Sequence, residues 1–198
     1  RGIPDSTSLI TGSFFKDGNF IYNSIINVSE KFNNVYNKEH LVPFGEFLPF
    51  KNMLGTIYDF IGLDIYDIKK GNTVKSLKIK NYIAHSLICY ESIFSFESLI
   101  TDKDTDFILN VSNDGWFGDN SLAPYQHLDA LVMRSLENQR YSIRSTNTGI
   151  SAVIAPNGTI ENFIQYNKSG IINKVIYARN GQTPISIYGS DILYFLLF

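Results

Sequence analysis

Two long, mainly apolar runs near the middle of the chain place the strongest constraint on its fold. They span residues 82–88 and 106–112. Runs of this kind are typical of strands buried on both faces of a sheet, so the sheet needs a covering layer on each side. The first run ends at Cys89, after which residues 92–100 are expected to form a helix. The second leads into a polar loop over residues 113–119.

Shorter patterns on either side supply further strands and one long helix. We expect a helix over residues 123–142, whose apolar side chains share one face, and a turn at residues 156–159. The further strands are expected in two hairpins and one last strand: residues 8–15 with 19–28, residues 150–155 with 160–165, and residues 171–177. Strands mixed with helices in this way predict an α/β layered sandwich.

The overall composition excludes several classes of protein. A length of 198 residues suits one domain, and 44% hydrophobic with 18% charged residues is typical of a globular chain. The net charge is −2 and the basic residues do not cluster, so nucleic acid is not expected as a partner. The single cysteine excludes an internal disulfide and a cysteine-based zinc cluster. The sequence has no glycine-rich phosphate loop, and we expect no cofactor.

A segment rich in proline, glycine and aromatic residues interrupts the strands. Residues 41–50 contain two prolines and are unsuited to a central strand or helix, whereas residues 53–63 are apolar and predict a short helix. Two interpretations stay open: a helix packed on the core, or an exposed lid or loop that contacts a membrane.

Both ends of the sequence have the character of internal points of a longer protein. Residues 1–5 contain neither an initiator methionine nor a signal-peptide pattern. Residues 191–198 are mainly apolar, and a membrane span needs about 20 such residues, so this end is either a core terminus or the start of a span. We expect residues 1–180 to form one domain and residues 185–198 to begin a membrane-spanning helix.

Cys89 is the candidate nucleophile, because it lies where a buried strand gives way to a helix. Backbone N–H groups at such a junction stabilise a thiolate and an oxyanion. Free cysteines are also common in apolar cores, so position alone leaves both interpretations open. Lys38 would place a cation beside the oxyanion, and Glu46 would hold its ammonium group in place. Glu91 would serve the same cluster, although lysine and glutamate are more often simply surface residues.

Other groupings of polar residues fit less well. Asp102, Asp104 and Asp106 begin like a calcium-binding loop, but Phe107 occupies the position that needs glycine. The three histidines lack the spacing of a zinc site. A hydrolytic triad through His127 would lack the Gly-x-Ser-x-Gly sequence, and a single helical histidine is usually structural.

Four separated motifs, in order, resemble one family, the apolipoprotein N-acyltransferases of the nitrilase superfamily. Residues 36–49 resemble the lysine-bearing motif of that family, and Ile88-Cys89-Tyr90-Glu91 resembles its nucleophile motif. Residues 112–118 followed by Gln126-His127, and then residues 144–152, complete the pattern. The resemblance covers nearly the whole chain.

The resemblance implies a nitrilase-like α-β-β-α sandwich and a Glu–Lys–Cys triad. Cys89 would attack a phospholipid ester, become a thioester and pass the acyl chain to the N-terminal cysteine amine of an apolipoprotein. Lys38 would be the triad lysine, Glu46 and Glu91 would be supporting acidic residues, and Tyr90 would offer a backbone N–H to the oxyanion. The domain would face the periplasm and be held at the bacterial inner membrane.

In one respect the sequence departs from the pattern of the family. The general-base glutamate of the family lies in a Trp-Pro-Glu-like segment, which residues 1–7 would follow. We therefore expect a fragment whose fold is incomplete at the N-terminus, which lacks the base and is inactive alone. Two alternatives stay open: a soluble amidase of the same superfamily that uses water as its acceptor, and a degenerate inactive domain.

Overall fold

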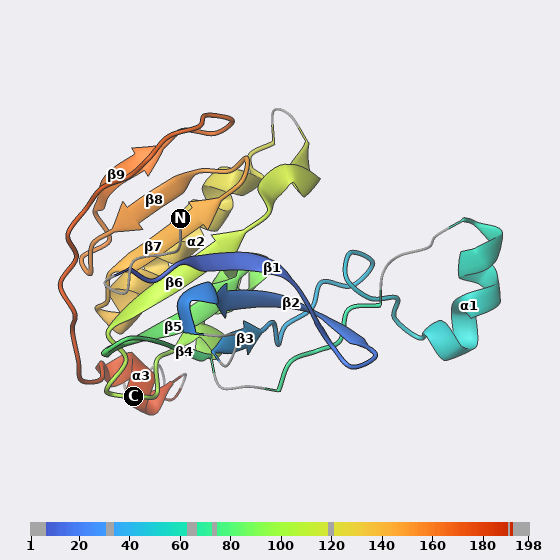
Figure 1. Ribbon diagram of the computed structural model, residues 1–198, viewed down its shortest axis with the longest axis horizontal. Helices are drawn as coiled ribbons and strands as arrows, with labels where there is room; N and C mark the ends of the chain where they lie inside the picture. Colours follow the sequence, from blue (N-terminus) through green and yellow to red (C-terminus); the bar gives the residue numbers. More distant parts are fainter. Residues whose placement is uncertain are drawn as a thin grey trace.

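The strands of the protein form two sheets that pack face to face. In a computed structural model of the chain, the described residues are 7–30, 34–62, 67–72, 75–118, 121–189 and 191. The smaller sheet is antiparallel and contains β1 (Ile10–Asp17), β2 (Phe20–Asn27) and β3 (Val35–Asn37). Figure 1 shows β1 and β2 lying across the larger sheet.

The larger sheet has six strands in the order β4-β5-β6-β7-β8-β9. The strands β5, β6 and β7 run parallel, and the outer strands pair antiparallel. Their bounds are β4 (Ser76–Ile79), β5 (Tyr82–Ile88), β6 (Phe107–Ser112), β7 (Ser142–Thr146), β8 (Ser151–Ile154) and β9 (Ile160–Ile164). The two apolar runs of the sequence are therefore the neighbouring central strands β5 and β6.

Each face of the large sheet has its own core, because successive side chains of a strand point to opposite faces. Helix α2 (Ala123–Asn138) covers one face, where Leu128 and Leu131 cluster with Leu87 and Ile108. The small sheet covers the other face. This second core consists of Ile25, Tyr36, Leu77, Ala84, Ile88, Phe107 and Leu109. The layered α/β sandwich expected from the sequence is confirmed.

The hairpins expected from the sequence are present, with small shifts at their ends. In the first hairpin Asp17 pairs with Phe20, so the turn consists of Gly18 and Asn19. Gly18 has a φ of 57°, a conformation that glycine adopts without strain. The expected long helix ends at Asn138, four residues early. The short elements β3, β4, η1 (Val28–Glu30), η4 (Asp114–Phe117) and α3 (Pro184–Tyr188) were not expected.

The helix expected over residues 92–100 is wrong. This segment contains two short 3₁₀ helices, η2 (Cys89–Ile93) and η3 (Phe96–Ser98). Arg134 from α2 donates to the carbonyl oxygens of Ser92 (3.0 Å) and Ile93 (3.2 Å), which a continuing helix would use for its own hydrogen bonds.

The strand expected over residues 171–177 is also wrong. These residues are irregular, and none of them joins a sheet in the described part of the chain. Ile171, Val175 and Tyr177 are exposed, whereas Ile176 packs against the second core.

Helix α1 (Lys51–Phe60) projects from the sandwich at one end of the molecule (Figure 1). Of its residues only Tyr58 is buried, and the Tyr58 hydroxyl donates to the carbonyl oxygen of Pro49 (2.8 Å). Five large apolar side chains in and beside the helix are more than half exposed: Phe50, Met53, Ile57, Phe60 and Ile61. Of the two interpretations left open for this segment, the structure supports the exposed one.

The C-terminal expectation falls mainly on residues that the structure does not describe. Residues 190 and 192–198 lie outside the described residues. Among the helices that are described, none has the length and apolar character needed to span a bilayer.

Candidate active site

Cys89 follows the last residue of β5 and has an unusual backbone conformation. Its φ of 53° lies in the left-handed region, which costs a non-glycine residue about 1–2 kcal/mol. The carbonyl oxygen of Cys89 accepts a hydrogen bond from the Ser92 hydroxyl (3.2 Å), which closes the turn of η2. The side chain is partly exposed. The thiol is therefore accessible and lies at the end of a buried strand, as the sequence predicted.

Glu91 is fully buried and joins the cysteine segment to the lysine segment. Its Oε2 accepts from the backbone N–H of Ile88 (2.7 Å), immediately before Cys89. Its Oε1 accepts from the Tyr36 hydroxyl (2.8 Å) and from the backbone N–H groups of Glu39 (2.9 Å) and His40 (3.0 Å). Burial, followed by the charge of Glu91, raises the pKa of Tyr36, so this hydroxyl stays protonated and donates. Glu91 thus fixes the two segments relative to each other.

Lys38 is buried and forms the ion pair with Glu46 that its sequence position suggested. Its Nζ lies 2.6 Å from Glu46 Oε2, which also accepts from the backbone N–H of Val42 (2.8 Å). Glu46 Oε1 accepts from the side chain of Asn23 in β2 (2.7 Å). Within the described residues no hydrogen bond or ion pair joins Lys38 to Cys89. The structure therefore orients the ammonium group through Glu46.

The backbone around Lys38 is held on both sides. Its N–H donates to the carbonyl oxygen of Asn23 (2.8 Å), and its carbonyl oxygen accepts from the N–H of Gly71 (2.8 Å). Any side chain at position 71 would overlap the carbonyl oxygen of Asn37, so glycine is required for this close approach.

Tyr90 follows the cysteine, and its ring lies beside the rings of Phe94 and His127. The ring is 39% exposed and meets Phe94 edge to face, with centroids 5.3 Å apart. The side chain therefore borders the site, and the role implied for Tyr90 concerns only its backbone N–H.

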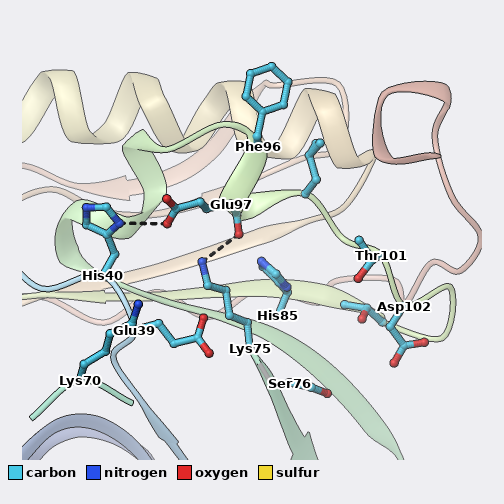
Figure 2. Close-up of a pocket in the computed structure, with 12 residues that line it drawn as sticks. Glu39, His40, Lys70, Lys75, Ser76, His85, Phe96, Glu97, Thr101 and Asp102 are labelled. Atoms are coloured by element: carbon cyan, nitrogen blue, oxygen red, sulfur yellow. Dashed lines mark hydrogen bonds and ion pairs between the residues drawn. The ribbon is translucent and has the colours of Figure 1, made fainter. Parts of the chain in front are cut away.

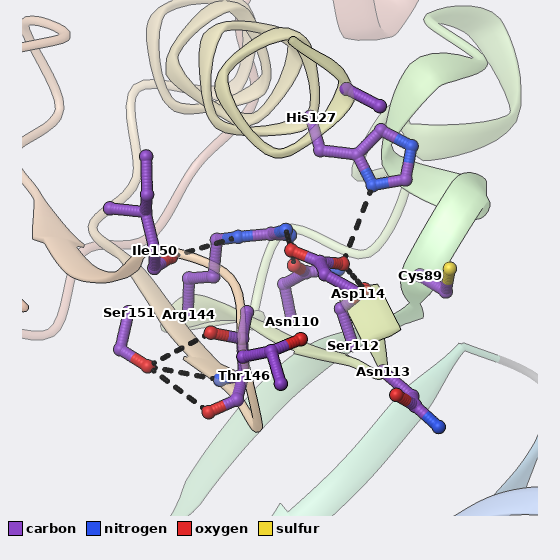
Figure 3. Close-up of polar contacts among 12 residues, drawn as sticks. Cys89, Asn110, Ser112, Asn113, Asp114, His127, Arg144, Thr146, Ile150 and Ser151 are labelled. Carbon is purple, nitrogen blue, oxygen red and sulfur yellow. Dashed lines mark hydrogen bonds and ion pairs between the residues drawn. The ribbon is translucent and has the colours of Figure 1, made fainter. Parts of the chain in front are cut away.

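A buried ion pair supports the loop that faces Cys89. Arg144 donates to Asp114 Oδ2 (2.8 Å), to the carbonyl oxygen of Ile150 (3.2 Å) and to the side chain of Asn110 (Figure 3). Burial by itself would raise the pKa of Asp114, but His127, Arg144 and a hydrogen bond from Ser112 outweigh it and hold the pKa below its ordinary value. Asp114 is therefore ionised at neutral pH.

Cys89, Asp114 and His127 come together although they belong to three separate segments. A sulfur, a carboxylate oxygen and a ring nitrogen of these residues all lie within 4.8 Å of one another. Figure 3 shows His127 projecting from α2 toward Asp114, with Cys89 beside them. His127 is only 3% exposed, and its Nδ1 lies 3.8 Å from Asp114 Oδ1, which is longer than a hydrogen bond. This buried nitrogen has no hydrogen-bond partner.

The topology explains why these residues meet. Cys89 follows β5, Asp114 follows β6, and the loop that begins at Asn147 follows β7. These three strands are parallel neighbours, so their carboxyl ends share one edge of the sheet, where sites of open α/β folds form. Asn147 ties the two loops together, since its Oδ1 accepts from the N–H of Asp114 (3.1 Å).

A separate cavity of about 450 Å³ is lined by His85, in the middle of β5, and not by Cys89 (Figure 2). Its lining includes His85 and the charged residues Glu39, Lys70, Lys75, Glu97 and Asp102. Burial, followed by the charge of Lys75, lowers the pKa of His85 to about 3. His85 is therefore neutral at physiological pH.

The fold and the motifs agree with comparisons to known proteins. Residues 6–179 match the model of the carbon-nitrogen hydrolase family. The chain belongs to the carbon-nitrogen hydrolase family. A carbon-nitrogen hydrolase of Helicobacter pylori G27 superposes with a TM-score of 0.61 at 12% identity, and the match covers 96% of this chain and 67% of that one. The nitrilase-like fold class predicted from the sequence is therefore confirmed. An amidase from Nesterenkonia sp. has the same TM-score, coverage of 96% and 67%, and 14% identity.

Curated relatives within the carbon-nitrogen hydrolase family are closer in sequence. Proteins named apolipoprotein N-acyltransferase are 37% identical over 195 residues in Wigglesworthia glossinidia brevipalpis and 39% identical over 200 residues in Pasteurella multocida. These matches cover 94% and 95% of this chain. The chain spans about two fifths of the length of these relatives, 39% and 38% respectively. The resemblance drawn from the four motifs is thereby confirmed.

Sequence reasoning missed the arrangement around Asp114, Arg144 and His127. All three lie in motifs that the resemblance included, but no role was assigned to them. The available signal concerned Asp114 alone: a polar residue just after β6 lies at the same sheet edge as Cys89 once β5 and β6 are known to be parallel. Arg144 lies within β7 and His127 in α2, so strand order alone does not indicate them.

Proposed function

We propose that this chain is part of the catalytic domain of an apolipoprotein N-acyltransferase, in which Cys89 carries the acyl group and the general-base glutamate lies outside the given residues. The observation that carries the proposal is the name shared by relatives at 37–39% identity over 94–95% of the chain. The arrangement of the motif residues supports it. Cys89 is accessible at a strand end, and Lys38 is buried against Glu46 in a segment that Glu91 joins to the cysteine.

In the first step the Cys89 sulfur attacks the carbonyl carbon of a phospholipid ester. The carbon–sulfur bond forms, the ester carbon–oxygen bond breaks, and the thiol proton leaves with the lysophospholipid alkoxide. The product is an acyl thioester on Cys89. A thioester is more reactive toward an amine than the original ester, so the covalent route divides one difficult transfer into two easier ones.

The Lys38 ammonium group, held in place by Glu46, provides positive charge for this step. An ammonium group that one carboxylate holds in place loses little freedom when negative charge develops on the carbonyl oxygen. The backbone N–H of Tyr90, in the first turn of η2, offers a further donor to the same oxygen. Glu91 acts by positioning, because its bonds reach the backbone on both sides of the site.

In the second step the N-terminal cysteine amine of an apolipoprotein attacks the thioester carbonyl. The carbon–nitrogen bond forms, the carbon–sulfur bond breaks, and the Cys89 sulfur regains a proton from the amine. The products are an N-acylated lipoprotein and free enzyme. The two substrates are thus a phospholipid and an apolipoprotein.

The exposed apolar face of α1 supports work at a lipid surface. Large apolar side chains at positions 53, 57 and 60 recur with helical spacing and so share one face. Such a face gains free energy by entering the boundary between headgroups and acyl chains. We place the domain at the periplasmic face of the bacterial inner membrane, with α1 toward the lipid.

Mass spectrometry tests the proposal. The protein encoded by the whole reading frame is incubated with phospholipid vesicles, and we expect one acyl mass on the peptide that contains Cys89. An apolipoprotein peptide should then remove it and gain the same mass on its amine. Cys89→Ala should abolish the adduct and Lys38→Met should slow its formation, whereas Lys75→Met, which changes a lysine outside the motif, should not.

The products discriminate between the alternatives. An adduct that persists in Cys89→Ala contradicts the assignment of the nucleophile. Release of free fatty acid or ammonia without transfer to the peptide indicates a hydrolase that uses water. A folded wild-type protein that forms no adduct and releases no product indicates an inactive domain.

A further inference from the structure

The cluster of Cys89, Asp114 and His127 brings three potential metal ligands together. We propose that these three side chains bind one zinc-class divalent cation, and that the bound cation reversibly blocks the Cys89 thiol. The cation site rests on the geometry of the cluster alone. Its inhibitory consequence also rests on the proposed acyl transfer.

The separations within the cluster suit ligands of one ion. Zinc bonds of about 2.0–2.3 Å in a tetrahedron place two ligand atoms roughly 3.3–3.8 Å apart. For one nitrogen and one oxygen ligand the separation would be roughly 3.3–3.5 Å. His127 Nδ1 and Asp114 Oδ1 are 3.8 Å apart, too far for a hydrogen bond and a few tenths of an ångström wider than this. All three ligand atoms lie within 4.8 Å of one another, so shifts of about 1 Å bring the thiol into the same geometry.

The unpaired nitrogen of His127 is the second observation that points to a ligand. Buried polar atoms almost always have a partner, and leaving one without a partner costs about 1–3 kcal/mol. His127 Nδ1 is buried and has none. A cation between His127 and Asp114 would accept the nitrogen lone pair and remove this cost.

The surroundings fix the carboxylate and leave an entry path. Arg144 donates to Asp114 Oδ2, while Oδ1 accepts from the Ser112 hydroxyl and has its remaining lone pair for an ion on the side of His127. Such supporting contacts orient ligands and strengthen metal binding. Cys89 is partly exposed, so an ion can reach the cluster from solvent, and the fourth coordination position remains for water.

The chemistry of the ligands selects the class of ion. A thiolate and an imidazole favour zinc and its neighbours among the transition metals, whereas magnesium and calcium prefer oxygen ligands. On binding, the Cys89 thiol loses its proton to solvent and forms a sulfur–metal bond. The same sulfur cannot attack an ester until the metal leaves.

Cobalt(II) absorption tests the site on the purified chain without lipid. We expect one Co²⁺ per chain with a thiolate-to-cobalt charge-transfer band, and stoichiometric loss of the band when Zn²⁺ is added. Cys89→Ser should lose the band, and His127→Gln should weaken Zn²⁺ binding by more than about tenfold. His40→Gln, which changes a partly exposed histidine outside the cluster, should match wild type.

A measurement that needs no variant guards against misfolding of the His127 substitution. Zn²⁺ should slow iodoacetamide alkylation of wild-type Cys89 at least about tenfold, and Mg²⁺ at the same concentration should not. Absence of the charge-transfer band, or equal alkylation with and without Zn²⁺, overturns the proposal. If Zn²⁺ protects the thiol but the full-length protein transfers no acyl group, the metal site stands and the proposed function fails.

Discussion

Glu91→Gln tests whether one buried carboxylate holds the two halves of the site together. Glutamine has the shape of glutamate but replaces one oxygen with a donor and removes the charge. The Glu91 carboxylate is the acceptor in all four of its hydrogen bonds. The donors are the Tyr36 hydroxyl and the backbone N–H groups of Ile88, Glu39 and His40. A side-chain NH₂ group in place of Oε2 would face the N–H of Ile88, donor against donor.

The size of the effect follows from these contacts. Hydrogen bonds to a charged group contribute about 1.5–3 kcal/mol and neutral ones about 0.5–1.5, so three weakened bonds lose about 1 kcal/mol each. The fourth bond, from the N–H of Ile88, is lost entirely, which costs about 1–3 kcal/mol. Burying a neutral amide costs less than burying a charge, and this difference offsets part of the loss. We expect a net loss of about 4 kcal/mol in the free energy of unfolding.

Urea unfolding followed by circular dichroism measures this loss. The matched control is Glu97→Gln, because Glu97 is 49% exposed and its side chain pairs with His40 at the surface. Exposed pairs contribute no more than about 1 kcal/mol. If Glu91→Gln and Glu97→Gln unfold within about 1 kcal/mol of each other, Glu91 does not hold the site as described.

Three further predictions concern the supporting loop, acid stability and the projecting helix. Gly149→Ala should lower the free energy of unfolding by about 3 kcal/mol, because the added Cβ would overlap the Asp114 carboxylate and disturb its ion pair; urea unfolding measures this loss. The free energy of unfolding should fall by about 2 kcal/mol from pH 7 to pH 5 because of His85 alone, as measured by urea unfolding at each pH. In the unfolded chain His85 takes up a proton near pH 6.5, whereas in the folded chain its pKa is about 3 and it stays neutral. Phe60→Asp should weaken binding to phospholipid vesicles at least about tenfold in a sedimentation assay, because the exposed Phe60 ring would otherwise enter the lipid.

Each of these predictions has a control. Gly55→Ala in α1 should be neutral or stabilising by about 1 kcal/mol, since nothing lies within 4 Å of the added Cβ. His85→Leu should remove its share of the pH dependence, and an unchanged slope would contradict the assignment. Asn52→Asp places the same charge on α1 about a quarter turn away from the apolar face, so equal loss of vesicle binding in both helix variants would indicate a general effect of charge.

Local patterns were sufficient to predict the central strands. The apolar runs of β5 and β6 are continuous because both faces are covered, and covered strands leave a strong signal. The projecting α1 was predicted as an element but not placed, because its apolar residues fit a core or a lipid surface equally well. Residues 171–177 misled for a related reason: an apolar side chain such as Ile176 can pack on the core from an irregular segment that joins no sheet.

The site was predicted only in part, for a different physical reason. Lys38, Glu46 and Glu91 were identified through motifs, and the ion pair of the first two follows from their closeness in sequence. The contact of Cys89 with Asp114 and His127 depends on the parallel order of β5 and β6 and on the placement of α2. No local pattern encodes that order, so these contacts required the three-dimensional structure.

At position 89 the residue that would best stabilise the fold differs from the residue that the proposed chemistry needs, because the backbone there is left-handed. Glycine adopts a φ of 53° without the strain that cysteine incurs there, about 1–2 kcal/mol. A randomised library at position 89 that is sorted only for folded protein should therefore enrich glycine. A library sorted for acyl transfer should return cysteine, and the difference between the two outcomes would measure what the chain gives up in stability to keep its nucleophile.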